Sequence, residues 1–351
     1  MKQVDYIIAG QGIAGSLLAW FLLQRGQEVL VVDPQVAGTP SGVSGGMIHP
    51  VTGRRIVKTW MADTLIPFAR KTYTDIEDKL AERFFEDYPV LEIFNDTQHR
   101  NDWAGRSADA GMDLYVKEEC PPGAVPEGII APYGGRWVVN GGWLETPRFL
   151  DAMRRHLSGK NSFLRDKIAF QETEKTETGI RWKDYTAKAI IDCTGVDLYN
   201  DPQSDGMPFN PCKGELLHIN AEGLPKNMVI HGSIKIIPTG GNSYFCGATY
   251  DYTKRDTICT EEGKEKIELA IKKLTSVPYT ITHHRSAVRP STTDRKPIIG
   301  PHFKNERYYF FNGLGSKGIL LGPWHAQLLV KHLLDETEIP DEYRPYRRKI
   351  C

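Results

Sequence analysis

Three glycines near the start of the chain stand where a strand would turn into a helix. Residues 4–9 have the apolar run of a buried strand, Gly10, Gly12 and Gly15 follow, and an apolar helix comes next. Gly10 would permit a tight turn, Gly12 would let backbone amides approach a pyrophosphate, and Gly15 would let helix and strand pack closely. Asp33 ends the next strand, where a carboxylate can accept hydrogen bonds from ribose hydroxyls. The unit predicts a dinucleotide site and leaves NAD and FAD both open.

A second glycine-rich turn lies late in the chain. Gly313, Gly315 and Gly318 separate the strand-like run 308–311 from an apolar helix that extends to about Leu334. A second helix N-terminus directed into the same crevice would stabilise negative charge on a reduced flavin ring, and nicotinamide chemistry has no such need. The turn therefore favours FAD, with helix packing alone as the alternative use of these glycines.

Charge and hydropathy exclude some classes of protein. The 351 residues contain 44 Lys and Arg and 44 Asp and Glu, and this balance disfavours a dedicated nucleic-acid-binding protein. The longest mostly apolar stretch, residues 13–23, is shorter than the roughly 20 residues of a membrane span. The N-terminus leads directly into a strand and not into a secretory leader, so we expect a cytoplasmic protein without a membrane helix.

Cysteine and histidine spacing gives no indication of a metal. The six cysteines are scattered, which in a chain of this length predicts reduced thiols. The ten histidines include no pair at metal-binding helical spacing, and the adjacent His283 and His284 cannot easily direct both rings to one ion. We therefore expect no metal site.

The remaining pattern predicts two domains. Helical periodicity occurs at 73–84, from Thr146 to Leu157 and at 261–274; short strands and loops are expected at 88–140, and further strands at 187–193, 215–219, 228–237 and 243–249. We expect an α/β fold of the α+β two-domain type, in which a Rossmann-like FAD-binding domain carries an inserted antiparallel-sheet substrate domain. The expected FAD-binding domain comprises residues 1–85, 141–214 and 283–351, and the substrate domain comprises residues 86–140 and 215–282.

Several motifs occur in the order seen in the D-amino-acid oxidase and glycine oxidase superfamily of FAD enzymes, which the chain resembles over nearly its full length. They are the opening glycine turn, 41–50, 142–144, 193–195, 247–250, 287–290 with Asp294, and 313–318. Some pieces are locally closest to the oxidase domain of the bifunctional enzymes that finish the methylaminomethyl-uridine modification of tRNA. The resemblance implies FAD-dependent oxidation of the C–N bond of an amine bearing a carboxylate, by hydride transfer to flavin N5. Such amines are glycine, N-substituted glycines and D-amino acids.

The resemblance also implies roles for three side chains. Arg289 would clamp the substrate carboxylate, because guanidinium offers two parallel donors; a surface arginine paired with Asp294 is the alternative. His49 would lie near the flavin ring, or else be a buried histidine bonded to a backbone carbonyl. Lys235 replaces a tyrosine frequent in glycine oxidases, and it would contact substrate or be a solvated strand lysine.

The cofactor implied is FAD, held non-covalently. Ala287 stands where the monomeric sarcosine oxidases carry a flavin-linking cysteine, so that bond cannot form here. The expected FAD contacts are Gly10, Gly12, Ile13, Ala14, Gly15, Asp33, Ser41, Gly42, Gly45, Gly46, Met47, Ile168, Thr194, Gly195, Gly313, Gly315, Ser316, Lys317, Gly318 and Ile319.

Basic segments keep other partners open. If the substrate were carboxymethylaminomethyl-uridine in tRNA, phosphates would meet one of two basic clusters: Arg54, Arg55 and Lys58, or Arg344, Arg347, Arg348 and Lys349. The zero net charge does not favour this reading, and a small amine or amino acid is the preferred partner. Alternatively, the first cluster and Trp60 would line the mouth of a pocket for a carboxylate larger than glycine, or form a solvent-facing loop.

A flavin-binding protein without turnover is a third reading, against which Arg289 argues.

Overall fold

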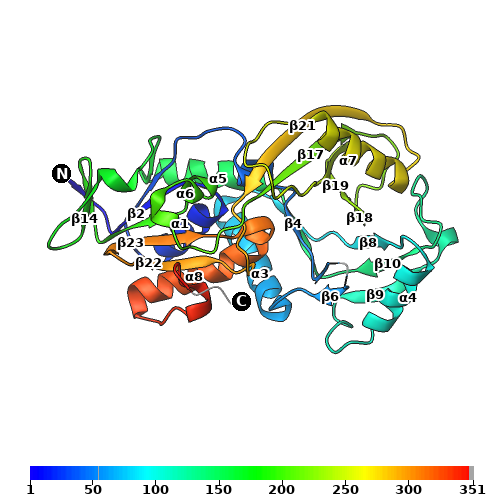
Figure 1. Cartoon of the computed structure of the whole chain (residues 1–351), viewed down its shortest axis with the longest axis horizontal. Coiled ribbons are helices and arrows are strands. Elements are labelled where there is room, and N and C mark those ends of the chain that lie inside the picture. The colour runs from blue at the N-terminus through cyan, green and yellow to red at the C-terminus, as the bar shows by residue number, and fades with distance from the viewer. Residues whose placement is uncertain (54, 348–351) are drawn as a thin grey trace.

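Two large sheets lie side by side in the computed structural model, which describes residues 1–53 and 55–347 (Figure 1). The helices are α1 (Ile13–Gln24), α2 (Pro40–Val43), α3 (Ala62–Leu80), α4 (Thr97–Arg106), α5 (Thr146–Gly159), α6 (Val196–Tyr199), α7 (Glu261–Leu274) and α8 (Gly318–Asp335). The strands of the two large sheets are β2 (Tyr6–Ala9), β3 (Val29–Val32), β8 (Val90–Ile93), β9 (Val116–Cys120), β10 (Gly135–Val138), β12 (Phe163–Leu164), β16 (Ala189–Asp192), β17 (Cys212–Asn220), β18 (Val229–His231), β19 (Lys235–Gly240), β20 (Ser243–Gly247), β21 (Thr280–Arg289), β22 (Ile298–His302) and β23 (Asn305–Asn312). Smaller sheets use β1 (Lys2–Gln3), β4 (Met47–Ile48), β5 (Val51–Thr52), β6 (Val57–Lys58), β7 (Phe85–Glu86), β11 (Gly142–Leu144), β13 (Thr173–Lys175), β14 (Ile180–Trp182) and β15 (Tyr185–Ala187).

The first large sheet has six strands in the order β12-β3-β2-β16-β23-β22, and all neighbours run parallel except β22 and β23. Successive residues of a strand face opposite sides of a sheet. Ile8 accordingly packs in the core that contains the α1 residue Leu17, while Ile7 packs with Trp182 of the small sheet on the other face. Burial on both faces explains why β2 and β3 are apolar throughout and why β16 is apolar up to its last residue, Asp192.

Helices α1 and α8 cover one face of this sheet together. They lie next to each other in Figure 1, where α1 is blue and α8 is orange. A Cβ atom on Gly322 of α8 would lie 2.7 Å from Cδ1 of Leu17 of α1, so glycine allows the two helices to approach closely. The N-termini of both helices are thereby brought to one edge of the sheet.

The second large sheet has the order β21-β17-β20-β19-β18-β8-β10-β9. It is antiparallel as expected, apart from one parallel pairing between β18 and β8. Helix α7 covers it through Ile267, Ile271 and Leu274. The long strands β17 and β21 pair with each other in this sheet, and both cross the expected domain boundaries, at 214/215 and 282/283. The domain division stays a proposal.

Two local expectations differ from the structure. Helix α4 lies where short strands and loops were expected; it buries Trp103, and its N-terminus is capped by Asp96, whose Oδ1 accepts a hydrogen bond from His99 N at 2.7 Å. A helix with so little apolar periodicity gives no pattern to detect. Helix α3 ends before Phe84, because Ala81 takes a left-handed conformation with φ of 52°. Among the described residues, no helix is both long enough and apolar enough to cross a membrane.

Candidate active site

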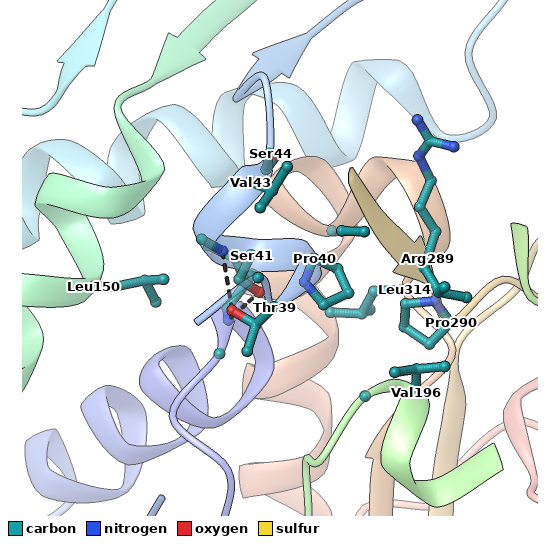
Figure 2. Close-up of a pocket in the computed structure, with 18 of the residues that line it drawn as sticks. Thr39, Pro40, Ser41, Val43, Ser44, Leu150, Val196, Arg289, Pro290 and Leu314 are labelled. Atoms are coloured by element: carbon teal, nitrogen blue, oxygen red, sulfur yellow. Dashed lines mark hydrogen bonds between the residues drawn. The ribbon is translucent and has the colours of Figure 1, made fainter. Parts of the chain in front are cut away.

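A long cavity of about 990 Å³ runs along the edge of the first sheet and reaches the second. Figure 2 shows part of it, with Thr39, Pro40 and Ser41 at the start of α2 on one side and Arg289, Pro290 and Leu314 on the other. Most residues expected to contact FAD line this cavity: Gly10, Gly12, Ile13, Ala14, Asp33, Ser41, Gly42, Gly45, Gly46, Met47, Ile168, Thr194, Gly195, Gly315, Ser316, Gly318 and Ile319. The two glycine turns therefore meet at one cavity, although they lie at opposite ends of the described chain.

Gly10, Gly15 and Gly313 act through packing geometry. Gly10 has φ of +95°, and a Cβ there would lie 2.7 Å from the carbonyl oxygen of Cys193. Gly15 and Gly313 do not line the cavity. A Cβ on Gly15 would lie 1.9 Å from Gly10 O, and Gly313, with φ of +72°, packs against Thr292. Side chains at these positions would force the turns apart.

The first turn presents donors and an acceptor suited to a dinucleotide. The N-cap of α1 is Gly12, and a Cβ there would lie 3.0 Å from Ser41 Oγ, which accepts a hydrogen bond from Ile13 N at 3.2 Å. Asp33 is fixed at the cavity because its two oxygens accept hydrogen bonds from Gln11 N and Gln35 N, each at 2.6 Å. A glycine-walled helix N-terminus beside an ordered carboxylate fits a pyrophosphate and its ribose.

A tight loop lies farther along the cavity. Trp143 Nε1 donates to Gly45 O at 3.0 Å, and a Cβ on Gly46 would lie 1.9 Å from Leu144 O. A Cβ on Gly45 would lie 2.5 Å from the Phe245 ring. The glycines thus let this loop pass between β11 and β20, which places the backbone from Gly45 to Met47 at the cavity wall.

Arg289 lies in the same cavity and has no carboxylate partner among the described residues. Its guanidinium donates to Thr249 O at 3.3 Å and to Lys213 O at 3.4 Å, and it lies 4.5 Å from the centre of the Tyr250 ring. Gly214 makes room for it, because a Cβ there would lie 2.2 Å from Arg289 Nη2.

The surface pairing considered for Arg289 is wrong. Both oxygens of Asp294 accept hydrogen bonds from Arg347, at 2.8 and 2.9 Å. Arg289 remains free to bind an anion that enters the cavity.

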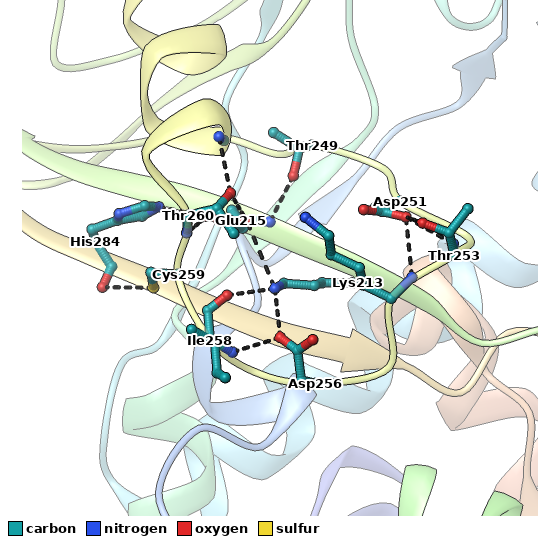
Figure 3. A network of polar contacts seen from close by, with 12 residues as sticks. Lys213, Glu215, Thr249, Asp251, Thr253, Asp256, Ile258, Cys259, Thr260 and His284 are labelled. Carbon is teal, nitrogen blue, oxygen red and sulfur yellow. Dashed lines mark hydrogen bonds and ion pairs between the residues drawn. The ribbon is translucent and has the colours of Figure 1, made fainter.

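A buried lysine anchors the segment that carries Tyr250 (Figure 3). Lys213 is 1% exposed, and its ammonium donates to Asp256 Oδ1 at 2.7 Å and to Ile258 O. Its backbone also exchanges hydrogen bonds with Asp251. Glu215 extends the network by accepting from Thr260 N and Oγ1 at 2.8 Å. Residues 249–260 are therefore held on β17, which positions the Arg289 contacts.

A second, smaller cavity of about 280 Å³ adjoins the first. The two share Met47, Gly247, Ala248, Tyr250, Lys235 and Ser316 as lining residues. His49 and Lys317 line the second cavity and not the first, whereas Lys235 lines both. Lys235 is thus a half-buried strand lysine that lines both cavities.

His49 is buried, but its partner is not the backbone carbonyl considered from the sequence. Its Nε2 lies 2.5 Å from Glu92 Oε1, and its Nδ1 accepts a hydrogen bond from Val51 N at 3.1 Å. Nε2 therefore carries the proton. His231 Nδ1 lies 2.6 Å from the same Glu92 oxygen. Burial alone would raise the pKa of Glu92, but the two histidines outweigh it and hold that pKa far below its usual range.

Two groups of described side chains are close enough to share a metal ion: His49, Glu92 and His231, and Glu215, Cys259 and His284. In the first, the separations of 2.5 and 2.6 Å are those of hydrogen bonds, and Lys235 and Lys317 line the same cavity with positive charge. In the second, the Glu215 oxygens already bind Thr260. We assign a metal to neither group.

The basic segments do not line either cavity within the described residues. Lys58 pairs with Asp63 at 2.7 Å, and Trp60 stacks on His325 with ring centres 6.2 Å apart. Arg55, Lys58 and Trp60 therefore do not take the expected place at either cavity. Arg55 is exposed, Arg344 pairs with Glu338, and Arg347 pairs with Asp294. Arg54, Arg348 and Lys349 lie outside the described residues.

Arg154 and Tyr250 are among the lining residues that sequence reasoning missed. Arg154 of α5 donates from Nε to Gln11 Oε1 at 2.8 Å and so connects α5 to the first glycine turn. In the sequence, nothing distinguishes Arg154 except its position on a predicted helix. Tyr250 ends the 247–250 motif, which was noticed but given no role, and it lines both cavities.

These features define a class of protein, and the sequence supports the same class. The chain matches the family described as FAD dependent oxidoreductase (DAO) over residues 5–332. It belongs to this family, so the expected family, two-domain fold and FAD cofactor are confirmed. It is an oxidoreductase.

Individual relatives refine this class. The chain is 25% identical to the tRNA 5-methylaminomethyl-2-thiouridine biosynthesis bifunctional protein of Marinobacter nauticus, over 94% of this chain and 55% of that protein. It is 24% identical to a glycine oxidase of Pseudomonas putida, over 99% of each chain. The chain thus spans about half the length of the bifunctional relatives.

Solved structures have the same fold at lower identity. Iminodiacetate oxidase from Chelativorans superposes with a TM-score of 0.81 at 18% identity, covering 97% of this chain and 99% of that chain. Glycine oxidase from Geobacillus kaustophilus superposes with a TM-score of 0.81 at 17% identity over the whole of both chains.

Proposed function

We propose that the protein oxidises the C–N bond of a small amine that bears a carboxylate, with FAD as the hydride acceptor. The observation that carries this proposal is Arg289, an arginine without a carboxylate partner among the described residues, in the cavity where both glycine turns meet. A guanidinium binds a carboxylate through two parallel, charge-assisted hydrogen bonds. The names of the glycine oxidase and iminodiacetate oxidase relatives support the same substrate class.

In this proposal the protein contributes position. Bound FAD supplies the hydride acceptor, and the residues lining the long cavity would hold it non-covalently. Arg289 would fix the substrate carboxylate. Gly214 and the Thr249 carbonyl would fix Arg289, and Tyr250 would cover it. Holding the α-carbon in one place is the main catalytic requirement, because hydride transfer depends on orientation.

The test is flavin bleaching without oxygen. The FAD-loaded protein is mixed with glycine, N-substituted glycines and D-amino acids, and loss of flavin absorbance is followed. Arg289→Lys keeps the positive charge but loses the two parallel N–H donors. We therefore expect substrate binding to weaken by about 2–3 kcal/mol with an unchanged flavin spectrum. Arg347→Lys is the control, because Arg347 binds Asp294 and lines neither cavity. Equal binding by Arg289→Lys and wild type would reject the proposal.

The non-covalent state of FAD has its own test. Ala287 lines the cavity and offers no nucleophile at the one attachment position considered. Acid precipitation is expected to release the flavin into the supernatant, and flavin in the pellet would contradict this.

Carboxymethylaminomethyl-uridine in tRNA is the second candidate substrate, supported by the bifunctional relatives. Two of the cations considered for phosphate contact, Lys58 and Arg347, are already paired with Asp63 and Asp294. The bleaching assay therefore includes tRNA carrying this nucleoside.

A further inference from the structure

The second cavity has an unbalanced charge. Lys235 and Lys317 both line it, and within the described part of the chain neither ammonium has a carboxylate within ion-pair distance. The hydrogen bond found for the Lys317 ammonium is to Thr52 Oγ1, at 3.4 Å. Burial, together with the positive charges of Arg295 and Lys235, lowers the pKa of Lys317 to about 8. An enclosed ammonium in these surroundings is stabilised by an anion.

Glu92 does not balance these lysines. Its Oε1 accepts hydrogen bonds from His49 Nε2 and His231 Nδ1, at 2.5 and 2.6 Å, so its charge is directed at the two rings. Glu92 itself does not line either cavity, whereas both histidines line the second one. The polar groups that a ligand would meet in this cavity therefore include two imidazole rings and two ammonium groups, set among apolar residues such as Val51 and Leu320.

The two cavities adjoin and share lining residues. Tyr250 lines both, and its ring covers the Arg289 guanidinium at 4.5 Å. Lys235 also lines both, at the start of β19, where it lies opposite Gly247 of β20. At about 280 Å³ the second cavity is below the usual range of a complete ligand site, roughly 300–1,000 Å³. It is suited to one arm of a ligand.

We propose that the second cavity binds a second carboxylate of the substrate between Lys235 and Lys317. This inference rests on the proposed function, in which Arg289 holds the first carboxylate. The substrate class is then an N-substituted glycine whose N-substituent ends in an acidic group. Such a diacid is recognised at both ends, while the C–N bond between them lies where the cavities join.

The experiment measures binding and needs no turnover. Oxydiacetate is a diacid with an ether oxygen in place of the amine, and methoxyacetate is its monoacid counterpart. Each is titrated into the FAD-loaded protein, and the dissociation constant is read from the perturbation of flavin absorbance. We expect oxydiacetate to bind about ten- to a hundredfold more tightly, as a charge-assisted contact predicts.

Variants of the two lysines test whether these residues cause the preference for the diacid. Lys235→Met and Lys317→Met should each weaken the binding of oxydiacetate about tenfold or more and that of methoxyacetate much less, so that the preference falls toward one, and Lys235→Arg should retain most of it. Lys226→Met is the matched control, because Lys226 is exposed and lines neither cavity. Flavin content and melting temperature are measured for every variant, so that a folding defect is recognised.

The outcomes separate the two proposals. Equal affinity of the wild type for the diacid and the monoacid overturns the second-carboxylate site. So does an equal effect of the lysine variants on both ligands, or an effect of Lys317→Met on flavin retention alone. If the diacid preference holds and depends on both lysines, while no amine bleaches the flavin, the site stands and the proposed oxidation fails.

Discussion

The long cavity has two ends that are built differently. At the nucleotide end, defined by residues 10–14 and 33–42, the walls are mostly backbone, and what matters is the absence of side chains at Gly10 and Gly12. At the substrate end, defined by Arg289, Tyr250 and Lys235, the chemistry is carried by side chains from separate strands and loops of the second sheet. We therefore expect truncation of a side chain to weaken substrate binding, and a side chain added at a glycine to weaken cofactor binding.

The largest effect is expected for Gly10→Ala. The new Cβ would lie 2.7 Å from Cys193 O at a φ of +95°, and backbone strain alone costs about 1–3 kcal/mol. We expect loss of bound FAD and a lower melting temperature. Gly26→Ala is the control, because Gly26 also has a positive φ, +71°, but its Cβ would have nothing within 4 Å. Full flavin content in Gly10→Ala would show that the backbone of the turn is not what determines cofactor binding.

Gly214→Ala should separate the two ends. Its Cβ would lie 2.2 Å from Arg289 Nη2, so the guanidinium must move. A displacement of about 1 Å is expected to weaken carboxylate binding or flavin reduction by about ten- to a hundredfold, with FAD content unchanged. In the Arg289→Lys background the same substitution should have little further effect. Additive losses would mean that Gly214 acts independently of Arg289.

The smallest effect concerns pH. Burial lowers the pKa of His218 in β17 and of His325 in α8 to about 4. The region of each large sheet therefore contains a histidine that is neutral at pH 7. Unfolding restores a pKa near 6.5, and the unfolded chain then binds more protons. The stability from each histidine is complete above about pH 6.5 and declines as the pH falls toward 4.

His325→Phe should reduce this acid sensitivity by up to about 1.4 kcal/mol per pH unit in that range. Free energies of unfolding from urea titrations at pH 7 and pH 5 provide the measurement, with His218→Phe as the counterpart in the other half. An unchanged pH dependence in both variants would contradict the lowered pKa values.

The difference between the two ends of the cavity also determines which site residues could be predicted from the sequence. Gly10, Gly12 and Asp33 lie within one short segment whose spacing dictates the turn, and all three line the cavity as that spacing indicates. Arg289 was found through a motif. The charges of the second cavity were not found, because Lys235 and Lys317 come together only through tertiary packing. The partners of His49 were missed for the same reason, since Glu92 and His231 are far from it in sequence.

The segment that carries Lys58 and Trp60 was also predicted poorly, because its residue types suit more than one location. Residues 54–60 combine cations with an indole, a pattern equally compatible with a pocket mouth and with an outer surface. Packing of Trp60 on His325, and pairing of Lys58 with Asp63, determine the result. Composition alone contains neither contact.

The close packing of α1 against α8 has a consequence for how the protein is made. The first helix begins at Ile13 and its partner at Gly318, so the apolar surface of α1 must wait for roughly 300 more residues to be synthesised. At about 5–20 residues per second, the ribosome needs on the order of 15–60 s for that length. During this time Leu17 and its neighbours lack their α8 cover, and the cavity lacks one wall. We therefore expect FAD to bind only after α8 has been synthesised.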